Sequence, residues 1–258
     1  MSKVMAVANQ KGGVGKTTTA VNCSAALALQ GKRVLVVDTD PQGNTTSGLG
    51  VDKTKAHMST YDVLINGAEL GAAIQKTQVE GLFLAPADIK LAGAEVEMVH
   101  LERREYIIKD ALAPHRNQYD YILMDCPPSL GLLTVNALTA ADTVIVPIQC
   151  EYYALEGVTQ LVDTIRLVKK RLNPELEIEG VLLTMFDPRT RLSVQVVDSV
   201  KGFFKHKVFS SLIPRNVRLG EAPSYGKPIL LYDPQCAGAH AYEDLAEEII
   251  RNNEGEEL

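Results

Sequence analysis

Residues 11–18, Lys11-Gly12-Gly13-Val14-Gly15-Lys16-Thr17-Thr18, decide how this chain folds. They follow an apolar run, 4–8, that is typical of a buried strand, and they lead directly into a helical pattern. A glycine-rich turn between a strand and a helix N-terminus gathers backbone N–H groups and the positive end of the helix dipole around one anion. We therefore predict a phosphate-binding loop, in which Lys16 reaches the β- and γ-phosphates and the Thr17 hydroxyl ligates Mg²⁺.

The loop departs from the usual phosphate-loop pattern at its first position. Counting back from Gly15, the first glycine of that pattern falls at position 10, where this chain has Gln10. A second lysine, Lys11, opens the loop instead, and the usual pattern has no role for it. A flexible surface turn is also rich in glycine, but the order of strand, loop and helix favours the nucleotide site.

Apolar runs alternate with helical periods along the whole chain. This pattern is typical of an α/β fold, here of the P-loop NTPase class, with a mostly parallel twisted sheet and helices on both faces. The chain has 258 residues, 46% of them hydrophobic, which is enough for a single domain with a sizeable core. We expect that domain over 1–251 and a polar, acidic, disordered tail over 252–258. The expected strands are 4–8, 33–38, 82–85, 121–125, 143–149, 180–184 and 208–213, and the expected helices include 17–30, 154–172 and 240–251.

The cysteines and the N-terminus favour a cytoplasmic protein. Cys23, Cys126, Cys150 and Cys236 are scattered, with no pair at metal or disulfide spacing, so reduced thiols are expected. The residues after Met1 do not resemble a signal peptide, and no apolar run approaches the roughly 20 residues that span a bilayer.

The charge is unevenly distributed. A net charge of −6 argues against a uniformly basic nucleic-acid binder. From Arg166 to Arg218, however, eleven Lys or Arg stand against five Asp or Glu. Such a basic third of an acidic chain is either a phosphate-binding face or a solvated set of helix charges, and charge alone leaves both open.

Carboxylates follow two of the expected strands. The second strand ends in Asp38-Thr39-Asp40-Pro41-Gln42-Gly43-Asn44, and the run Tyr121-Ile122-Leu123-Met124-Asp125 has the Walker B form. Ligands of an open parallel sheet bind beyond the carboxyl ends of its strands, so these acids are expected beside the loop. Asp40 is placed to orient or activate an attacking water and Asp38 to help hold the metal shell. Asp125 is placed to accept a hydrogen bond from a magnesium-bound water or from Thr17.

These three stretches resemble the nucleotide motifs of the ParA/MinD superfamily of deviant Walker ATPases. Two further stretches, Gln149-Cys150-Glu151-Tyr152-Tyr153-Ala154-Leu155-Glu156-Gly157 and Ile213-Pro214-Arg215-Asn216-Val217-Arg218, are similar to chromosomal ParA proteins, often called Soj. The resemblance runs from Lys3 to about Arg251.

The resemblance implies roles for individual residues. Lys11 would reach across a two-fold interface to the partner subunit's phosphates, where it would neutralise charge during phosphoryl transfer and make dimerisation depend on ATP. The implied catalytic residues are Lys11, Lys16 and Asp40, and the implied metal site comprises Thr17, Asp38 and Asp125. The positions expected to bind the nucleotide are Lys11, Gly12, Gly13, Val14, Gly15, Lys16, Thr17 and Thr18, with Met185, Pro214 and Asn216 at the adenine.

The resemblance also implies that the ATP-bound dimer binds double-stranded DNA without sequence preference. Contacts to phosphates would supply affinity without sequence information, and they would weaken steeply with salt. No basic stretch is interleaved with aromatic residues, which favours duplex over single strands. The expected DNA contacts are Arg189, Arg191, Arg215 and Arg218, with Lys201, Lys205 and Lys207 as supports.

The function that the resemblance implies is an ATP-dependent molecular switch for chromosome or plasmid partitioning, with slow intrinsic hydrolysis. ATP binding would build a homodimer on the nucleoid. A ParB-type centromere-binding protein would stimulate hydrolysis and reset the switch. Chromosomal members also touch replication-initiation control, which makes a replication initiator a candidate partner that the sequence leaves open.

Other functions on the same scaffold stay open as alternatives. A MinD-like membrane-associated positioning ATPase carries a basic amphipathic C-terminal helix, whereas residues 247–258 are acidic. An iron–sulfur carrier needs cysteines that bridge a dimer; Cys126 and Cys150 are candidates, although cysteines beside small apolar residues usually pack in the core. A plasmid-type ParA that represses its own operon usually has an N-terminal helix-turn-helix region, and only three residues precede the first expected strand here.

Overall fold

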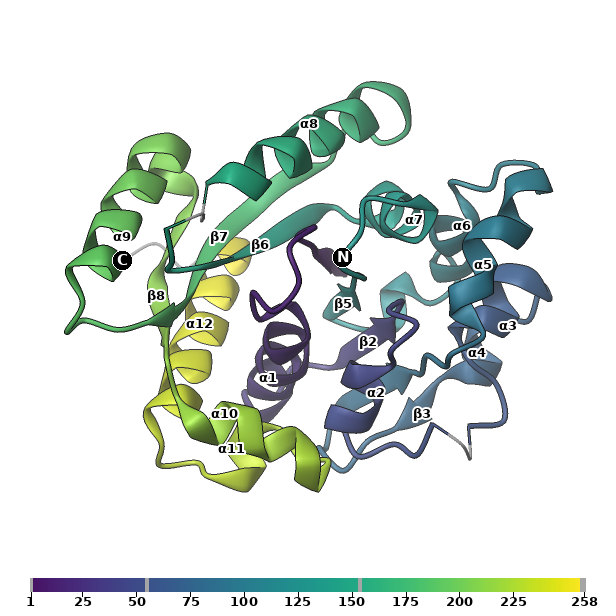
Figure 1. The fold of residues 1–258 in the computed structure, drawn as a ribbon. Helices are drawn as coiled ribbons and strands as arrows, with labels where there is room; N and C mark the ends of the chain where they lie inside the picture. Colours follow the sequence, from purple (N-terminus) through teal and green to yellow (C-terminus); the bar gives the residue numbers. More distant parts are fainter. Residues whose placement is uncertain (1, 54–55, 153–154, 256–258) are drawn as a thin grey trace.

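A twisted β-sheet with helices on both faces forms the body of the protein (Figure 1). The computed structural model describes residues 2–53, 56–152 and 155–255. Within these residues the sheet has eight strands in the order β3-β4-β2-β5-β1-β6-β7-β8. Only the β3–β4 pair is antiparallel, so the predicted α/β class with a mostly parallel sheet is confirmed. The strands are β1 (Lys3–Val7), β2 (Val34–Asp38), β3 (Gln75–Lys76), β4 (Leu82–Ala85), β5 (Tyr121–Asp125), β6 (Thr143–Gln149), β7 (Glu177–Phe186) and β8 (Val208–Pro214).

The helices divide between the two faces of the sheet. One face is covered by α1 and α12, whose buried side chains share a core with Met5 and Val7 of β1. The other face packs residues of α3 and α5 to α9 against Val4 and Ala6, because successive side chains of a strand point to opposite faces. The helices are α1 (Lys16–Leu29), α2 (Asn44–Gly48), α3 (Thr60–Ile65), α4 (Leu70–Ala73), α5 (Leu91–Glu97), α6 (Ile107–Leu112), α7 (Leu132–Ala140), α8 (Glu156–Arg171), α9 (Arg191–Phe204), α10 (Val217–Glu221), α11 (Ile229–Tyr232) and α12 (Ala237–Glu254).

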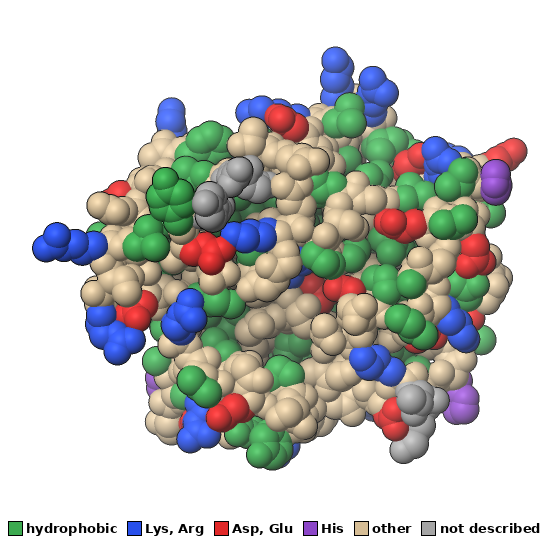
Figure 2. Space-filling model, viewed as in Figure 1, with side chains coloured by type: hydrophobic (Ala, Val, Ile, Leu, Met, Phe, Trp, Pro, Cys, Tyr) green, Lys and Arg blue, Asp and Glu red, His purple; other side chains and the backbone are tan. Residues whose placement is uncertain are grey.

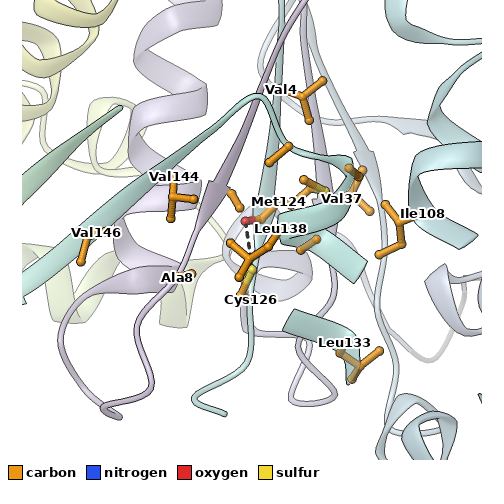
Figure 3. Close-up of a cluster of buried hydrophobic side chains, with 14 of the residues drawn as sticks. Val4, Ala8, Val37, Ile108, Met124, Cys126, Leu133, Leu138, Val144 and Val146 are labelled. Atoms are coloured by element: carbon orange, nitrogen blue, oxygen red, sulfur yellow. Dashed lines mark hydrogen bonds between the residues drawn. The ribbon is translucent and has the colours of Figure 1, made fainter. Parts of the chain in front are cut away.

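Cys126 belongs to the second of these cores. Figure 3 shows it among apolar side chains that include Met124, Leu138 and Val144. Its thiol donates a weak hydrogen bond to the backbone oxygen of Met124 at 3.9 Å. The side chain is fully buried, and burial is the main cause that raises the pKa of this thiol well above its usual range. Such a thiol packs as a small apolar group and is a poor metal ligand.

The strand register brings the functional carboxylates together. Asp38 at the end of β2 pairs with Asp125 at the end of β5, and Val7 at the end of β1 also pairs with Asp125. The strand order reverses around β1, where β5 lies on one side and β6 on the other. A crevice beyond the strand ends at such a reversal is the usual ligand site of an open α/β sheet.

The C-terminal helix differs most from the sequence expectation. Residues 252–254, expected in a disordered tail, form the last turn of α12, which ends before Gly255 with φ of 68°. Contacts distant in sequence hold this turn: Asn253 Nδ2 donates to Glu179 Oε1 at 2.6 Å, and Lys32 Nζ lies 2.6 Å from Glu254 Oε1. Residues 256–258 of the expected tail, and the expected helix start at 154, lie outside the described residues.

The short strand β3 was not expected, since two residues give no periodicity. In the described part of the chain, no helix combines the length and apolar character needed to cross a membrane.

Candidate nucleotide-binding site

The glycine-rich loop joins β1 to α1 as predicted. Gly13 and Gly15 have φ of 74° and 93°, in the left-handed region where side chains are disfavoured, so glycine is needed at both turns. Strand β7 anchors the loop, because the Thr184 hydroxyl donates to the Val14 carbonyl at 2.8 Å. A backbone fixed in this way presents its N–H groups at the N-terminus of α1 without further ordering.

Lys16 lies buried at the first position of α1, with 6% of its surface exposed. Its ammonium donates to the Lys11 carbonyl at 2.9 Å. Burial lowers the pKa of Lys16, and the nearby Asp125, Cys126 and Asp40 oppose that shift. A phosphate in the loop would offset the cost of burying this cation, which fits the expected role of Lys16.

Lys11 has a partner within its own chain. Its ammonium forms an ion pair with the carboxylate of Glu151, which follows β6, and each side chain is 36% exposed. The Lys11 backbone N–H donates to Asn9 Oδ1 at 3.0 Å, and Asn9 Nδ2 donates to the Pro147 carbonyl at 2.7 Å. The start of the loop is therefore tied to β6 and the segment after it.

Asp125 is the central acid of the site and is fully buried. Its Oδ2 accepts hydrogen bonds from the hydroxyls of Thr17 at 2.9 Å and Thr45 at 2.7 Å. Its Oδ1 is buried and has no hydrogen-bond partner among the described residues. Burial above all, and then the charge of Asp38, raises the pKa of Asp125 to about 8, while the two threonine hydroxyls oppose the shift.

These contacts fit a magnesium ion. An orphaned carboxylate oxygen in a buried site carries an energetic penalty that a cation or a metal-bound water would relieve. Mg²⁺ usually keeps several waters and is held by one or two carboxylates together with substrate phosphates. Within the described residues no cluster of three or more His, Cys, Asp or Glu is placed to hold a metal by itself. The arrangement of Thr17 and Asp125 therefore suits an ion shared with a bound phosphate.

Asp38 is engaged by the protein itself. Its Oδ1 accepts from the Asp40 N–H at 3.1 Å, and its Oδ2 accepts from the backbone N–H and the hydroxyl of Thr46 at 2.8 and 2.7 Å. Burial raises the pKa of Asp38 to about 6 despite these bonds. The sequence predicts that Asp38 helps to hold the metal shell, and its contacts support an indirect part, in which it fixes the turn that carries Asp40.

Asp40 lies on that turn with 6% of its surface exposed. Its Oδ1 accepts from the Gln42 N–H at 2.9 Å, and its carbonyl accepts from the Gly43 N–H at 2.8 Å. Gly43 has φ of 57°, and a Cβ there would meet the Lys53 side chain at 2.7 Å and the Ala87 carbonyl at 3.0 Å. The charge of Asp40 also shifts the pKa of Lys16, so it lies beside the loop as expected.

A cavity of about 360 Å³ adjoins the loop at Gly15 and Thr18. Met185, Pro214 and Asn216, the three expected adenine contacts, all line it, with Ile213 and Leu219 among the apolar walls. The volume and the mixed lining are typical of a small-molecule pocket. In Figure 2 the surface is hollowed below its centre, between the regions that Figure 1 labels α10 and α2.

Three polar residues of the site were not predicted from the sequence: Thr45, Glu151 and Thr184. Each contacts a predicted residue that is far away in the chain. Thr45 directly follows the acidic turn, and Glu151 lies in the stretch similar to chromosomal ParA proteins. For Thr45 and Glu151, this position within a recognised motif was the sequence signal that could have predicted a role in the site.

Comparison with known proteins shows the family. Residues 2–178 match a family model described as an AAA domain. The chain is 59% identical over 252 residues to the sporulation initiation inhibitor protein Soj of Bacillus subtilis, covering 98% of this chain and 100% of that protein. It is 55% identical over 250 residues to the chromosome partitioning protein ParA of Caulobacter vibrioides, covering 96% and 94%. This chain belongs to the ParA/Soj family of chromosome-partitioning ATPases.

A solved structure is similar to this ParA/Soj chain over its whole length. It is named cobyrinic acid a,c-diamide synthase from Mycobacterium smegmatis and contains ADP and magnesium. Its TM-score is 0.88 at 42% identity, with 100% of this chain and 97% of that chain covered.

The expected DNA contacts of this ParA/Soj chain gather near α9 and α10. Arg189, Arg191, Arg215 and Arg218 are all exposed. Figure 2 shows Lys and Arg side chains over the regions of α9 and α10, at the left, with acidic side chains between them.

Two of these arginines have acidic partners within the chain. Arg189 Nε and Nη2 donate to the two carboxylate oxygens of Asp187 at 2.9 and 2.7 Å. Arg218 pairs with Glu221 at 2.9 Å and Asp233 at 3.3 Å. The positive surface is therefore weaker than a count of its arginines indicates.

Proposed function

We propose that this chain is an ATP-dependent molecular switch for chromosome partitioning, which binds ATP with Mg²⁺ and hydrolyses it to ADP and phosphate. The observation that carries the proposal is the buried Asp125, one oxygen of which accepts from Thr17 while the other has no described partner. The relatives named for chromosome partitioning, and the ADP and magnesium in the M. smegmatis structure, support the same reading.

Each residue of the loop and strand ends has a part in the proposed reaction. The loop N–H groups and Lys16 bind the β- and γ-phosphates, and the Thr17 hydroxyl and Asp125 orient the metal shell. Mg²⁺, when bound, offsets the charge that develops on the phosphate oxygens. Asp40, held by the turn from Asp38, orients the attacking water and accepts its proton. The adenine lies in the cavity lined by Met185, Pro214 and Asn216.

The proposed switch is a homodimer in the ATP state. Lys11 has to leave Glu151 in order to reach the phosphates of a second subunit, and a γ-phosphate supplies the negative charge that draws it there. Hydrolysis is expected to be slow without a partner, as the family resemblance implies. A ParB-type protein is proposed to accelerate the step.

The proposed DNA surface consists of Arg189, Arg191, Arg215 and Arg218. Their exposed guanidinium groups suit contacts with phosphates, which carry no sequence information. The proposed location is therefore the nucleoid.

A MinD-like function at a membrane is less well supported. In this chain Tyr242, Leu245 and Ile249 of α12 are fully buried against the core, so these apolar side chains are not available to a lipid surface. The exposed positions around them include several acidic residues, which anionic lipids would repel.

The proposal is tested by DNA binding of the wild type and of Arg218→Ala with ATP, with ADP and without nucleotide. Long duplex of random sequence at low salt is used, and the oligomeric state is measured in parallel. We expect the wild type to bind only with ATP, and Arg218→Ala to dimerise without binding. Arg103→Ala is the matched control, since Arg103 is an exposed arginine paired with Asp110 near α6. A wild type that dimerises with ATP but ignores DNA would refute the nucleoid function.

A further inference from the structure

Three threonines from separate segments hold Asp125. Thr17 of α1 and Thr45 of α2 both donate their hydroxyl protons to Oδ2. Thr39, which follows β2, binds the backbone of Asp125 instead of its side chain. The N–H and the hydroxyl of Thr39 donate to the Asp125 carbonyl at 3.0 and 2.7 Å. Backbone and side chain of this acid are therefore fixed from two directions.

Thr45 is placed for this contact by the turn before it. The residue is fully buried in the first turn of α2, which begins after Gly43. The next residue, Thr46, donates its N–H and hydroxyl to Asp38. Asp38 and Asp125 are paired in register on neighbouring strands, so consecutive threonines of α2 bind the carboxylates of adjacent strand ends.

This arrangement leaves different tasks to the two oxygens of Asp125. Oδ2 accepts two hydroxyl protons, which restrains rotation of the carboxylate. Oδ1 is buried and has no hydrogen-bond partner among the described residues, so its lone pairs are available to a bound group. Thr17 has one proton and two lone pairs, so when it donates to Oδ2 its lone pairs can face a metal ion.

We propose that Thr45 is a positioning residue of the metal site: its hydroxyl holds Asp125 so that Thr17 can ligate Mg²⁺ and Oδ1 can accept a hydrogen bond from a metal-bound water. The inference rests on the proposed function of the same site. It assigns to the short helix α2 the task of fixing Asp125 beside the metal site, and it couples the position of that helix to metal binding.

The test removes the hydroxyl and keeps the shape. Thr45→Val and Thr45→Ser are compared with the wild type in the binding of a fluorescent ATP analogue, first in EDTA and then across a Mg²⁺ titration. We expect Thr45→Val to bind the analogue normally in EDTA but to need about tenfold more Mg²⁺ for half-saturation, the loss typical of groups that orient metal ligands. Thr45→Ser restores the wild-type response, because it restores the hydroxyl.

The control is Thr139→Val. Thr139 is also fully buried, but its hydroxyl donates to the Val135 carbonyl within α7, so its Mg²⁺ response is expected to be unchanged. If Thr45→Val is too unstable to purify, Thr45→Ala removes the same hydroxyl and is expected to show the same shift.

Two results would overturn the inference alone. A normal Mg²⁺ response in the variants without the hydroxyl would show that Asp125 needs no help from Thr45. An equal defect in Thr45→Ser would assign the effect to packing. If instead the wild type shows no Mg²⁺-dependent nucleotide binding, the proposed function itself fails.

Discussion

The ammonium of Lys11 forms an ion pair with the carboxylate of Glu151 in the same chain. The lysine that the family resemblance assigns to a partner's phosphates is thus paired with an acid of its own chain. Both groups are about one-third exposed, and ion pairs of this kind contribute about 0–1 kcal/mol. The pair is weak enough for a bound γ-phosphate to displace it.

Removing the acid should therefore ease dimerisation. We expect Glu151→Gln to lower the ATP concentration at which half of the protein dimerises by about two- to fivefold, since 1 kcal/mol corresponds to a factor of about five. Size-exclusion chromatography with light scattering measures the effect across an ATP titration. Glu177→Gln is the control, because Glu177 pairs with Lys169 on α8. A higher ATP requirement for Glu151→Gln would mean that the acid stabilises the dimer.

Asp40 is expected to act in hydrolysis and not in binding. Asp40→Ala should slow phosphate release by about a hundredfold or more, the usual contribution of a positioned base, while ATP binding and dimerisation persist. Single-turnover phosphate release and analogue binding separate the two. Asp88→Ala is a suitable comparison, since Asp88 caps a nearby turn through the Lys90 N–H. Loss of ATP binding in Asp40→Ala would assign this acid to the nucleotide or metal instead.

The sequence predicts the scaffold of the site better than its contacts. The seven longer strands and the loop follow from apolar runs and from glycines, which are local signals. Thr45 contacts Asp125 from 80 positions away, and Glu151 contacts Lys11 from 140 positions away. Such pairings depend on strand order and register, which a single sequence does not specify.

The same limit explains the C-terminal helix. Residues 252–254 are polar and acidic, a composition typical of a frayed end. They form the last turn of α12 because Glu179 in β7 and Lys32 after α1 bind Asn253 and Glu254. The composition of residues 252–254 does not predict these contacts with distant residues.

Two buried acids should make the stability of the metal-free protein fall as the pH rises. Burial raises the pKa of Asp125 to about 8 and that of Asp38 to about 6, both above the ordinary value of 3.8. Between pH 3.8 and about 8 the folded state therefore binds more protons than the unfolded state. The stability that the two protonated acids contribute is present at low pH and is lost as the pH approaches 8. We expect the Tm in EDTA to fall between pH 5.5 and 8.

Asp125→Asn should reduce this decline, because an amide does not titrate. Asp187→Asn provides the control: its partner Arg189 lowers the pKa of Asp187 to about 2, so it does not titrate in this range. Differential scanning calorimetry at several pH values gives the slopes. A slope in Asp125→Asn as steep as that of the wild type would show that Asp125 is already ionised at pH 5.5.

The acidic partner of Arg189 should limit DNA binding. Asp187→Asn keeps an acceptor for the Arg189 N–H but removes one negative charge beside the proposed DNA surface. We expect about two- to fivefold tighter binding of nonspecific duplex in the ATP state at low salt, and a smaller gain as salt screens the charge. Fluorescence anisotropy across a salt series measures it. Asp163→Asn, which removes the exposed partner of Arg166 on α8, is expected to change little. Equal tightening in both variants would indicate a general effect of net charge, and unchanged binding in Asp187→Asn would place the DNA away from Arg189.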